Sequence, residues 1–237
     1  MYIWEECLKN FTSACVFKLY LINIYTINQI KIKKIKKMKN QYHYIIDKSG
    51  SMSDCQAKTV NCLNEQFTSL QRLALDEKKQ EFKASLHFFN SSLQTIINEQ
   101  NPMNLSKLQL NDFCPSGSTS LFDAIGIIAS AERLKSSEGV KSGQKKVVFV
   151  IITDGYENSS QLFNFENIRK LISEMQNEGY IFMFLGAIPN AKVVATNISI
   201  KDERAHSFDK KDMDTVFKKM GDCLSDLAKN KTNWNKF

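Results

Sequence analysis

Proline and long flexible linkers are scarce in this chain of 237 residues. It contains three prolines and no long Gly/Ser-rich stretch, although 43% of its residues are hydrophobic. A chain of this length can form one large domain or two small ones. Because no linker divides it, we expect one domain over residues 38–237, preceded by an N-terminal extension over residues 1–37.

The cysteines and histidines lack the spacing of a zinc or redox site. No two of the six cysteines form a CxxC pair, and the three histidines show no zinc-type spacing. A chain of this size needs no disulfide staples, so we expect reduced thiols and a cytoplasmic protein. The cysteines are Cys7, Cys15, Cys55, Cys62, Cys114 and Cys223. Cys55 and Cys62 are expected to be small buried hydrophobes, and His43, His87 and His206 to have structural roles.

A strongly basic body is also missing, despite a formal net charge of +7. Residues 1–37 hold seven Lys and two Glu, a net of +5, which leaves +2 for residues 38–237. A nearly neutral domain gives no reason to expect nucleic acid as a partner.

The N-terminal extension contains no uninterrupted membrane span. Its apolar part, residues 11–30, is broken by Lys18, Asn23 and Gln29, whereas a bilayer span needs about 20 apolar residues. A secretory signal would carry its positive charge before the apolar run, but here the lysine cluster follows at residues 31–37.

The composition of the extension favours a different origin. Ile, Lys, Tyr and Asn supply 20 of these 37 residues, a bias typical of translated AT-rich sequence. We therefore expect Met38 to be the native start and no membrane partner. The alternatives are a genuine flexible leader and an anchor that holds the domain at a membrane surface.

Strands and helices alternate beyond Met38. Residues 147–152 are apolar without alternation, as in a strand buried on both faces of a parallel sheet. Residues 82–89 alternate apolar and polar, which predicts a strand with one wet face. The predicted strands are 42–46, a hairpin at 82–97, 145–153, 180–187 and 205–208, and the predicted helices are 53–75, 119–135, 164–178, 191–198 and 211–229.

This order predicts a Rossmann-like, doubly wound α/β fold. The sheet is mostly parallel and six-stranded, with one antiparallel edge strand and helices on both faces. In such folds ligands bind at the carboxyl ends of the strands, near the topological switch point.

Three polar clusters fall at predicted strand ends. The first is Asp47-x-Ser49-x-Ser51, the second contains Thr119 in "CPSGSTSLFDA", and the third contains Asp154 in "ITDGYENSS". Each could be a turn or helix cap, a nucleophile loop, or a set of oxygen ligands for a metal.

Hard oxygen donors favour the metal interpretation. Two carboxylates and three hydroxyls suit Mg²⁺, Mn²⁺ or Ca²⁺ rather than zinc. Two Asp only cancel the charge of the ion, so the metal stays electrophilic toward an outside carboxylate. Two predicted helix N-termini at the same end also favour an incoming anion.

Signals for enzymatic chemistry are missing around these clusters. No Gly-rich loop ends in Gly-Lys-Ser/Thr, and no serine lies in a G-x-S-x-G elbow with an Asp and His to follow. Near the predicted metal there is no general base. We therefore expect a binding protein rather than an enzyme, with a metal-dependent hydrolase or phosphoryl-transfer enzyme as the alternative.

The neighbouring polar residues are expected to be structural. Asp54 lies in the first turn of a helix, where negative charge is favoured. Asp123 is expected to brace the Thr119 loop, and Glu157 and Asn158 to lie in a solvated loop beside the site.

The motifs "DKSGS", "GSTSL" and "TDG" together resemble the metal-ion-dependent adhesion site (MIDAS) of von Willebrand factor A domains. The resemblance covers about residues 42–229 and implies the strand order 3-2-1-4-5-6. It also implies direct ligation by Ser49, Ser51 and, with ligand bound, Thr119. Asp47 and Asp154 would act partly through water.

The segments "ITDGYENSS" and "FMFLGA" are more narrowly similar to stand-alone intracellular von Willebrand A proteins of bacteria and phages. The implied function is a Mg²⁺-dependent protein-binding module, with Mn²⁺ or Ca²⁺ as other candidate ions. An Asp or Glu of a partner protein would fill the open coordination position, and Phe122 and Tyr156 would add apolar contacts.

Overall fold

The computed structural model describes Ile22 and residues 37–231. The chain divides into two units, Met1–Lys36 and Lys37–Phe237, and every strand among the described residues belongs to the second unit. Apart from Ile22 and Lys37, the predicted extension lies outside the described residues. No helix among the described residues is long and apolar enough to cross a membrane.

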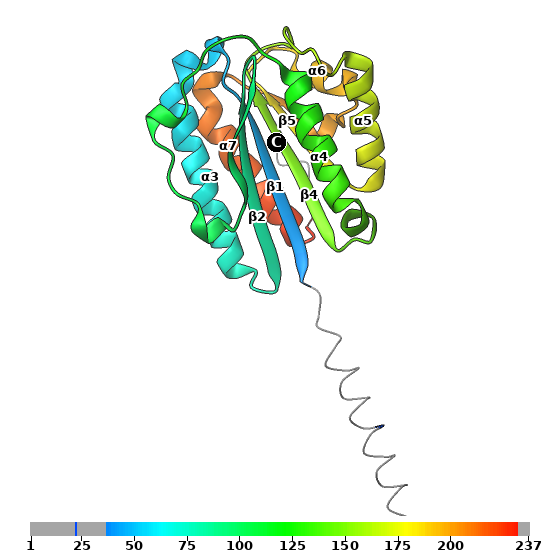
Figure 1. The fold of residues 1–237 in the computed structure, drawn as a ribbon. Helices are drawn as coiled ribbons and strands as arrows, with labels where there is room; N and C mark the ends of the chain where they lie inside the picture. Colours follow the sequence, from blue (N-terminus) through cyan, green and yellow to red (C-terminus); the bar gives the residue numbers. More distant parts are fainter. Residues whose placement is uncertain (1–21, 23–36, 232–237) are drawn as a thin grey trace, which may run out of the picture. The chain divides into compact units, whose positions relative to one another are not determined.

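A six-stranded sheet organises the second unit (Figure 1). Its strands are β1 (Met38–Asp47), β2 (Gln80–Phe89), β3 (Leu93–Gln100), β4 (Lys145–Thr153), β5 (Ile181–Gly186) and β6 (Ala205–Ser207). They lie in the order β3-β2-β1-β4-β5-β6. Only the β2–β3 pair is antiparallel. The predicted fold class and the antiparallel edge strand are confirmed.

Helices cover both faces of the sheet, as Figure 1 shows. Helices α3 (Gln56–Asp76) and α7 (Met213–Ala228) lie on one face; α4 (Leu121–Lys141), α5 (Phe165–Glu178) and α6 (Ala191–Asn197) lie on the other. Each face has its own hydrophobic core, and the strand residues from Val147 to Ile152 point alternately into the two. Full burial of each such side chain contributes about 1.5–3 kcal/mol.

Several element boundaries differ from the prediction. Strand β1 begins at Met38 rather than at residue 42, and α4 extends to Lys141 rather than 135. The segment Gly50–Cys55 forms a 3₁₀ helix, η1, before α3 begins. Polar residues at the start of β1 and the end of α4 interrupt the hydrophobic pattern. The pattern is therefore shorter than the hydrogen-bonded element in both cases.

Strand β2 is buried on both faces, so the prediction of a wet face was wrong. Its apolar residues pack in the core under α3 and α7, but Ser85 and His87 on the opposite face are buried as well. Ser85 accepts a hydrogen bond from Gln41 of β1 at 3.2 Å. The polar groups of this face therefore pair with one another instead of with water.

The pairing continues through two histidines. Nδ1 of His43 lies 3.2 Å from Nε2 of His87, whose Nδ1 lies 2.9 Å from Oγ1 of Thr95. On the other side, Nε2 of His43 lies 3.4 Å from Oε2 of Glu132, whose second oxygen bonds Lys145 at 2.6 Å. The predicted structural role of His43 and His87 is confirmed.

The thiols within residues 37–231 are all free. They belong to Cys55, Cys62, Cys114 and Cys223, and all but Cys114 are buried. The prediction that Cys55 and Cys62 are buried is confirmed.

The topological switch point falls between β1 and β4, where the strand order reverses direction. These two strands pair in register from Lys39 with Lys145 to Ile46 with Ile152. Their next residues, Asp47 and Thr153, therefore emerge side by side at the carboxyl edge of the sheet.

Candidate metal centre

The loop after β1 meets the loop before α4 through backbone hydrogen bonds. Gly50 donates its N–H to the carbonyl of Gly117 at 3.0 Å, and Ser116 donates to the carbonyl of Lys48 at 2.9 Å. A positive φ of 75° at Gly117 gives this loop a left-handed residue, which glycine adopts without a steric penalty. The first two predicted clusters are therefore fixed against each other.

Asp47 lies at the base of the site and is fully buried. Its Oδ1 accepts the N–H of Ser49 at 2.7 Å, and its Oδ2 accepts the hydroxyl of Thr153 at 2.6 Å. Burial raises the pKa of Asp47 and the nearby Asp154 charge adds to the rise, whereas the hydrogen bonds from Thr153 and Ser49 oppose it. A cation beside Asp47 would stabilise its ionised form.

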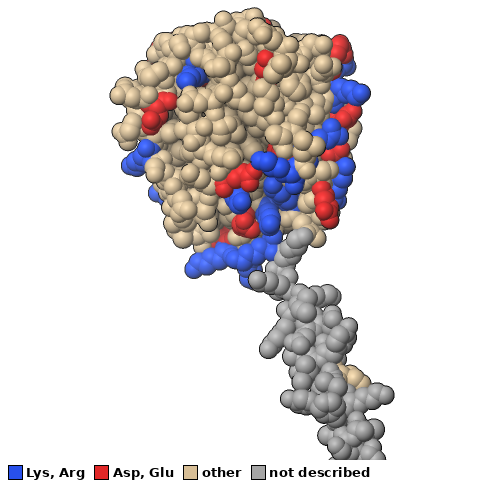
Figure 2. Space-filling view, in the orientation of Figure 1, with Lys and Arg blue, Asp and Glu red and all other residues tan. Residues whose placement is uncertain are grey.

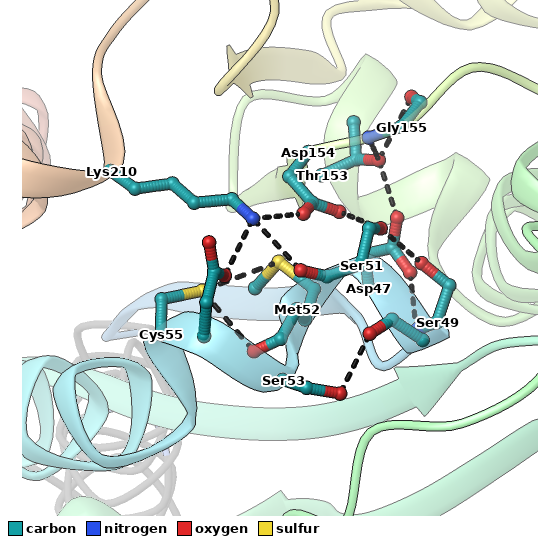
Figure 3. Close-up of polar contacts among 12 residues, drawn as sticks. Asp47, Ser49, Ser51, Met52, Ser53, Cys55, Thr153, Asp154, Gly155 and Lys210 are labelled. Carbon is teal, nitrogen blue, oxygen red and sulfur yellow. Dashed lines mark hydrogen bonds and ion pairs between the residues drawn. The ribbon is translucent and has the colours of Figure 1, made fainter.

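Ser49, Ser51 and Asp154 form a short chain of oxygen atoms (Figure 3). The hydroxyls of Ser49 and Ser51 lie 3.2 Å apart, and Ser51 donates to Oδ1 of Asp154 at 2.6 Å. Ser49 occupies the cap position of η1, but its side chain makes no capping hydrogen bond. The alternative of a helix cap is therefore wrong for Ser49, whose hydroxyl belongs to the cluster.

Thr119 approaches the same cluster from the loop before α4. It is buried, and a Cβ atom placed on Gly155 would lie 3.2 Å from its Oγ1 and 3.8 Å from Oδ2 of Asp47. The absence of a side chain at Gly155 is what allows this approach. The structure thus brings all five sequence-predicted residues to one edge of the sheet.

Asn158 holds the backbone of Thr119 from both sides. Its Oδ1 accepts the N–H of Thr119 at 2.9 Å, and its own N–H donates to the carbonyl of Thr119 at 3.1 Å. Asn158 lies exposed in a loop beside the site, as predicted, but its side chain also fixes the backbone of a candidate ligand. A polar loop sequence carries no signal for such a contact.

Glu157 caps the start of α4 instead of facing solvent, which corrects its prediction. Its Oε2 accepts the N–H of Phe122 at 2.8 Å and the hydroxyl of Ser160 at 2.7 Å. Its Oε1 accepts the backbone N–H groups of Ser159 at 2.9 Å and Ser160 at 2.7 Å. The carboxylate accepts hydrogen bonds from backbone N–H groups that have no partner within the helix. Its negative charge also interacts favourably with the positive end of the helix dipole.

Asp123 makes the reciprocal contact, from α4 back to the loop. Its two oxygens accept the N–H groups of Gln161, Leu162 and Phe163 at 2.8–2.9 Å. A bracing role was predicted for Asp123, but the segment it braces is 161–163 rather than the Thr119 loop. Together Glu157 and Asp123 hold the polar loop after β4, which contains Asp154, against helix α4.

Lys210, which sequence reasoning missed, reaches into the site from the turn before α7 (Figure 3). Its Nζ lies 2.6 Å from Oδ2 of Asp154 and 2.7 Å from Oδ1 of Asp54. Burial opposes the charge of Lys210, but hydrogen bonds to Asp154 and Asp54 outweigh it and raise the pKa of the lysine. Asp54, predicted as a first-turn charge, is in fact an ion-pair partner of Lys210.

The two aromatic residues predicted to contact a partner differ in exposure. The side chain of Tyr156 is 49% exposed and its hydroxyl donates to Asn190. Phe122 is partly buried and packs against the second core. Figure 2 shows that charged side chains on this face of the molecule gather mainly toward the lower part, away from the carboxyl ends of the strands.

The donor set fits a hard divalent cation. Two carboxylates and three hydroxyls gather at one edge of the sheet, and oxygen donors are what Mg²⁺, Mn²⁺ and Ca²⁺ prefer. Among residues 37–231 there is no group of three or more His, Cys, Asp or Glu placed to hold a metal. Any ion bound here would therefore depend on the serine and threonine hydroxyls.

A doubly wound α/β domain with D-x-S-x-S, Thr and Asp at its switch point defines a class: domains built around a metal-ion-dependent adhesion site. The sequence profile of the von Willebrand factor type A domain matches residues 43–222. This chain belongs to that family.

Solved structures with the same fold are distant in sequence. Proximal thread matrix protein 1 of the mussel byssus, with a zinc-occupied MIDAS motif, is 16% identical with a TM-score of 0.56, over 81% of this chain and 48% of that one. The pilus adhesin SpaC of Lactobacillus rhamnosus GG is 12% identical with a TM-score of 0.61, over 82% and 31%.

The PilB minor pilin of Streptococcus sanguinis is 14% identical with a TM-score of 0.57, over 83% of this chain and 64% of that one. The chain therefore spans between about a third and two thirds of the length of these proteins. No curated protein matches the sequence. At these identities the likeness shows a shared fold.

Proposed function

We propose that this chain is a divalent-metal-dependent protein-binding module that captures an acidic residue of a partner protein. The observation that carries the proposal is the chain of oxygen atoms from Ser49 through Ser51 to Asp154, beside the buried Asp47. The Ser49 hydroxyl makes no capping hydrogen bond, and hydroxyl groups are suitable neutral ligands for a hard ion.

In this proposal the ion is Mg²⁺, with Mn²⁺ or Ca²⁺ as other candidates. Ser49, Ser51 and, with a ligand bound, Thr119 would hold it directly, and Asp47 and Asp154 would act partly through water. When bound, the ion supplies an electrophilic position for an outside carboxylate. The protein's share is to orient the oxygens, which the hydrogen bonds from Thr153 to Asp47 and between Asn158 and Thr119 support.

A binding role is supported better than catalysis. The polar contacts around the five candidate ligands come from serine, threonine, asparagine and lysine side chains and from backbone groups. The two buried histidines pair with each other and with Glu132. Metal-dependent turnover of a phosphoester, lost in Asp154→Ala, would contradict this part of the proposal.

Two measurements test the proposed function. Calorimetry with Mn²⁺ alone should show one site in the wild type and none in Asp47→Asn. The matched control is Asp222→Asn, which removes the same charge from an exposed position on α7 and should bind like the wild type.

Capture of partners on the immobilised full chain forms the second test. A partner should be retained in Mg²⁺, released by EDTA, and lost with Asp47→Asn but not Asp222→Asn. Equal capture in Mg²⁺ and EDTA would overturn the proposal. The identity of the partner in the eluate also bears on the expectation that this protein is cytoplasmic.

A further inference from the structure

Lys210 is fully engaged with the candidate metal centre. Its ammonium group contacts Oδ2 of Asp154 at 2.6 Å, Oδ1 of Asp54 at 2.7 Å and the carbonyl oxygen of Ser51 at 2.8 Å. The Asp154 side chain is 1% exposed and that of Lys210 is 26% exposed. The pair with Asp154 is therefore largely shielded from water, where charge interactions are strong.

The contacts decide what this lysine can do. An ammonium group has three N–H donors, and Lys210 has three oxygen acceptors within hydrogen-bond distance. A partner's carboxylate would have to compete with these three oxygens for the ammonium group. A role in directly capturing an acidic ligand is therefore disfavoured.

The remaining role is electrostatic. Asp47 and Asp154 are the two carboxylates of the donor set, and Lys210 neutralises one of them. Asp54 is 68% exposed, so solvent screens its compensating charge. A divalent ion entering the site therefore meets a net charge of about −1 instead of −2, because the partly exposed ammonium group of Lys210 repels it.

We propose that Lys210 is an internal counter-cation that lowers the affinity of the metal centre for divalent ions. The proposal rests on the proposed function, because it concerns the same metal site. Lys210 competes with an ion for the carboxylate of Asp154. The site thereby releases its ion more readily than the same oxygen ligands without the lysine would.

The chain offers a closely matched control. Lys211 is the next residue, carries the same charge, is 74% exposed and pairs with Asp209 at 3.1 Å. Lys211→Met and Lys210→Met remove the same charge from adjacent positions, but only the second removes a contact to Asp154. A difference in Mn²⁺ affinity between the two variants therefore reports the contact with Asp154 rather than the change in net charge.

The test is Mn²⁺ affinity by calorimetry on the full chain, for wild type, Lys210→Met, Lys210→Arg and Lys211→Met. We expect Lys210→Met to bind Mn²⁺ about tenfold more tightly or better, with Lys210→Arg and Lys211→Met within about twofold of wild type. Thermal unfolding with and without Mn²⁺ gives a second measurement: the stabilisation by Mn²⁺ should be largest in Lys210→Met.

The outcomes separate this inference from the proposed function. If the wild type binds Mn²⁺ and Lys210→Met binds equally or more weakly, the counter-cation is overturned while the metal centre stands. If Lys210→Met is less stable but binds Mn²⁺ with unchanged affinity, Lys210 has a purely structural role. If no variant binds Mn²⁺, both proposals fail. If only Lys210→Met binds Mn²⁺, the lysine lowers the affinity of the wild-type site below what calorimetry detects, and this result supports the counter-cation.

Discussion

Thr153 and Asp47, the last residues of the neighbouring strands β4 and β1, share a 2.6 Å hydrogen bond from the threonine hydroxyl to Oδ2 of the aspartate. Both residues are fully buried. The hydroxyl also accepts the N–H of Gly155 at 3.1 Å. Thr153 thus orients the carboxylate at the base of the site and starts the turn that carries Asp154.

Replacing Thr153 by Val should therefore weaken both folding and the metal centre. The change leaves the buried Asp47 carboxylate without one of its donors, which costs about 1–3 kcal/mol. Urea unfolding in EDTA measures this cost, and Mn²⁺ calorimetry measures the effect on the site. Thr153→Ser keeps the hydroxyl and is the control; equal stability of the Val and Ser variants would show that the hydrogen bond contributes nothing.

The serine cluster offers a second prediction. Ser51→Ala removes a hydroxyl that donates to Asp154 and lies 3.2 Å from the Ser49 hydroxyl. Mn²⁺ affinity should fall by about tenfold or more, since a neutral oxygen ligand is lost. Ser53→Ala in the same 3₁₀ helix removes only a bond to the carbonyl of Gly50 and should bind Mn²⁺ like wild type. Similar losses in the two variants would refute the ligand assignment of Ser51.

Glu157 should matter for stability more than its loop position suggests. Glu157→Ala strips the cap from α4 and four hydrogen bonds from the loop, at a cost of about 2 kcal/mol or more. Chemical denaturation monitored by circular dichroism measures it. The control is Glu166→Ala, which removes an exposed acid from the first turn of α5 and should cost less than about 1 kcal/mol. A smaller loss at 157 than at 166 would contradict this account of the cap.

The buried side chain of His87 predicts lower stability in acid. Burial, and to a lesser extent the charges of His43 and Lys135, lower the pKa of His87 from 6.5 to about 3. Because the folded state resists protonation while the unfolded chain takes up a proton near pH 6.5, the free energy of unfolding falls as the pH drops from 6.5 toward 3. The loss should be about 1 kcal/mol between pH 7.5 and 5.5.

His206 contributes in the same direction, since burial lowers its pKa to about 4. His87→Gln should therefore remove part of the slope between pH 7.5 and 5.5, measured by urea unfolding in EDTA at each pH. An unchanged slope in His87→Gln would contradict the assignment to His87.

Glu132 acts only at lower pH: burial would raise its pKa, but hydrogen bonds from His43 and Lys145 lower it from 4.5 to about 2. Its stabilising contribution is therefore lost below about pH 4.5.

Much of the fold could be predicted because its signals are local. The continuous apolar run of β4 and the helical periods of α5 and α7 identify buried strands and covering helices, and the structure confirms them. Strand β2 is different, because its period-two pattern indicates one wet face. In the structure Ser85 and His87 are buried with polar partners from β1 and β3, and a partner on another element leaves no mark in the pattern.

The sequence by itself determined the order of the elements and the five oxygen-bearing residues of the candidate site, because each depends on nearby residues and on a recognisable motif, although Thr119 lies in the loop before α4 and not at a strand end. Only the tertiary structure decided that Asn158 holds Thr119, that Glu157 caps α4 and that Lys210 neutralises Asp154. These contacts join segments far apart along the chain, and their residue types are those of ordinary solvated loops. Their roles arise from the parallel sheet, which gathers the carboxyl ends of its strands at one edge.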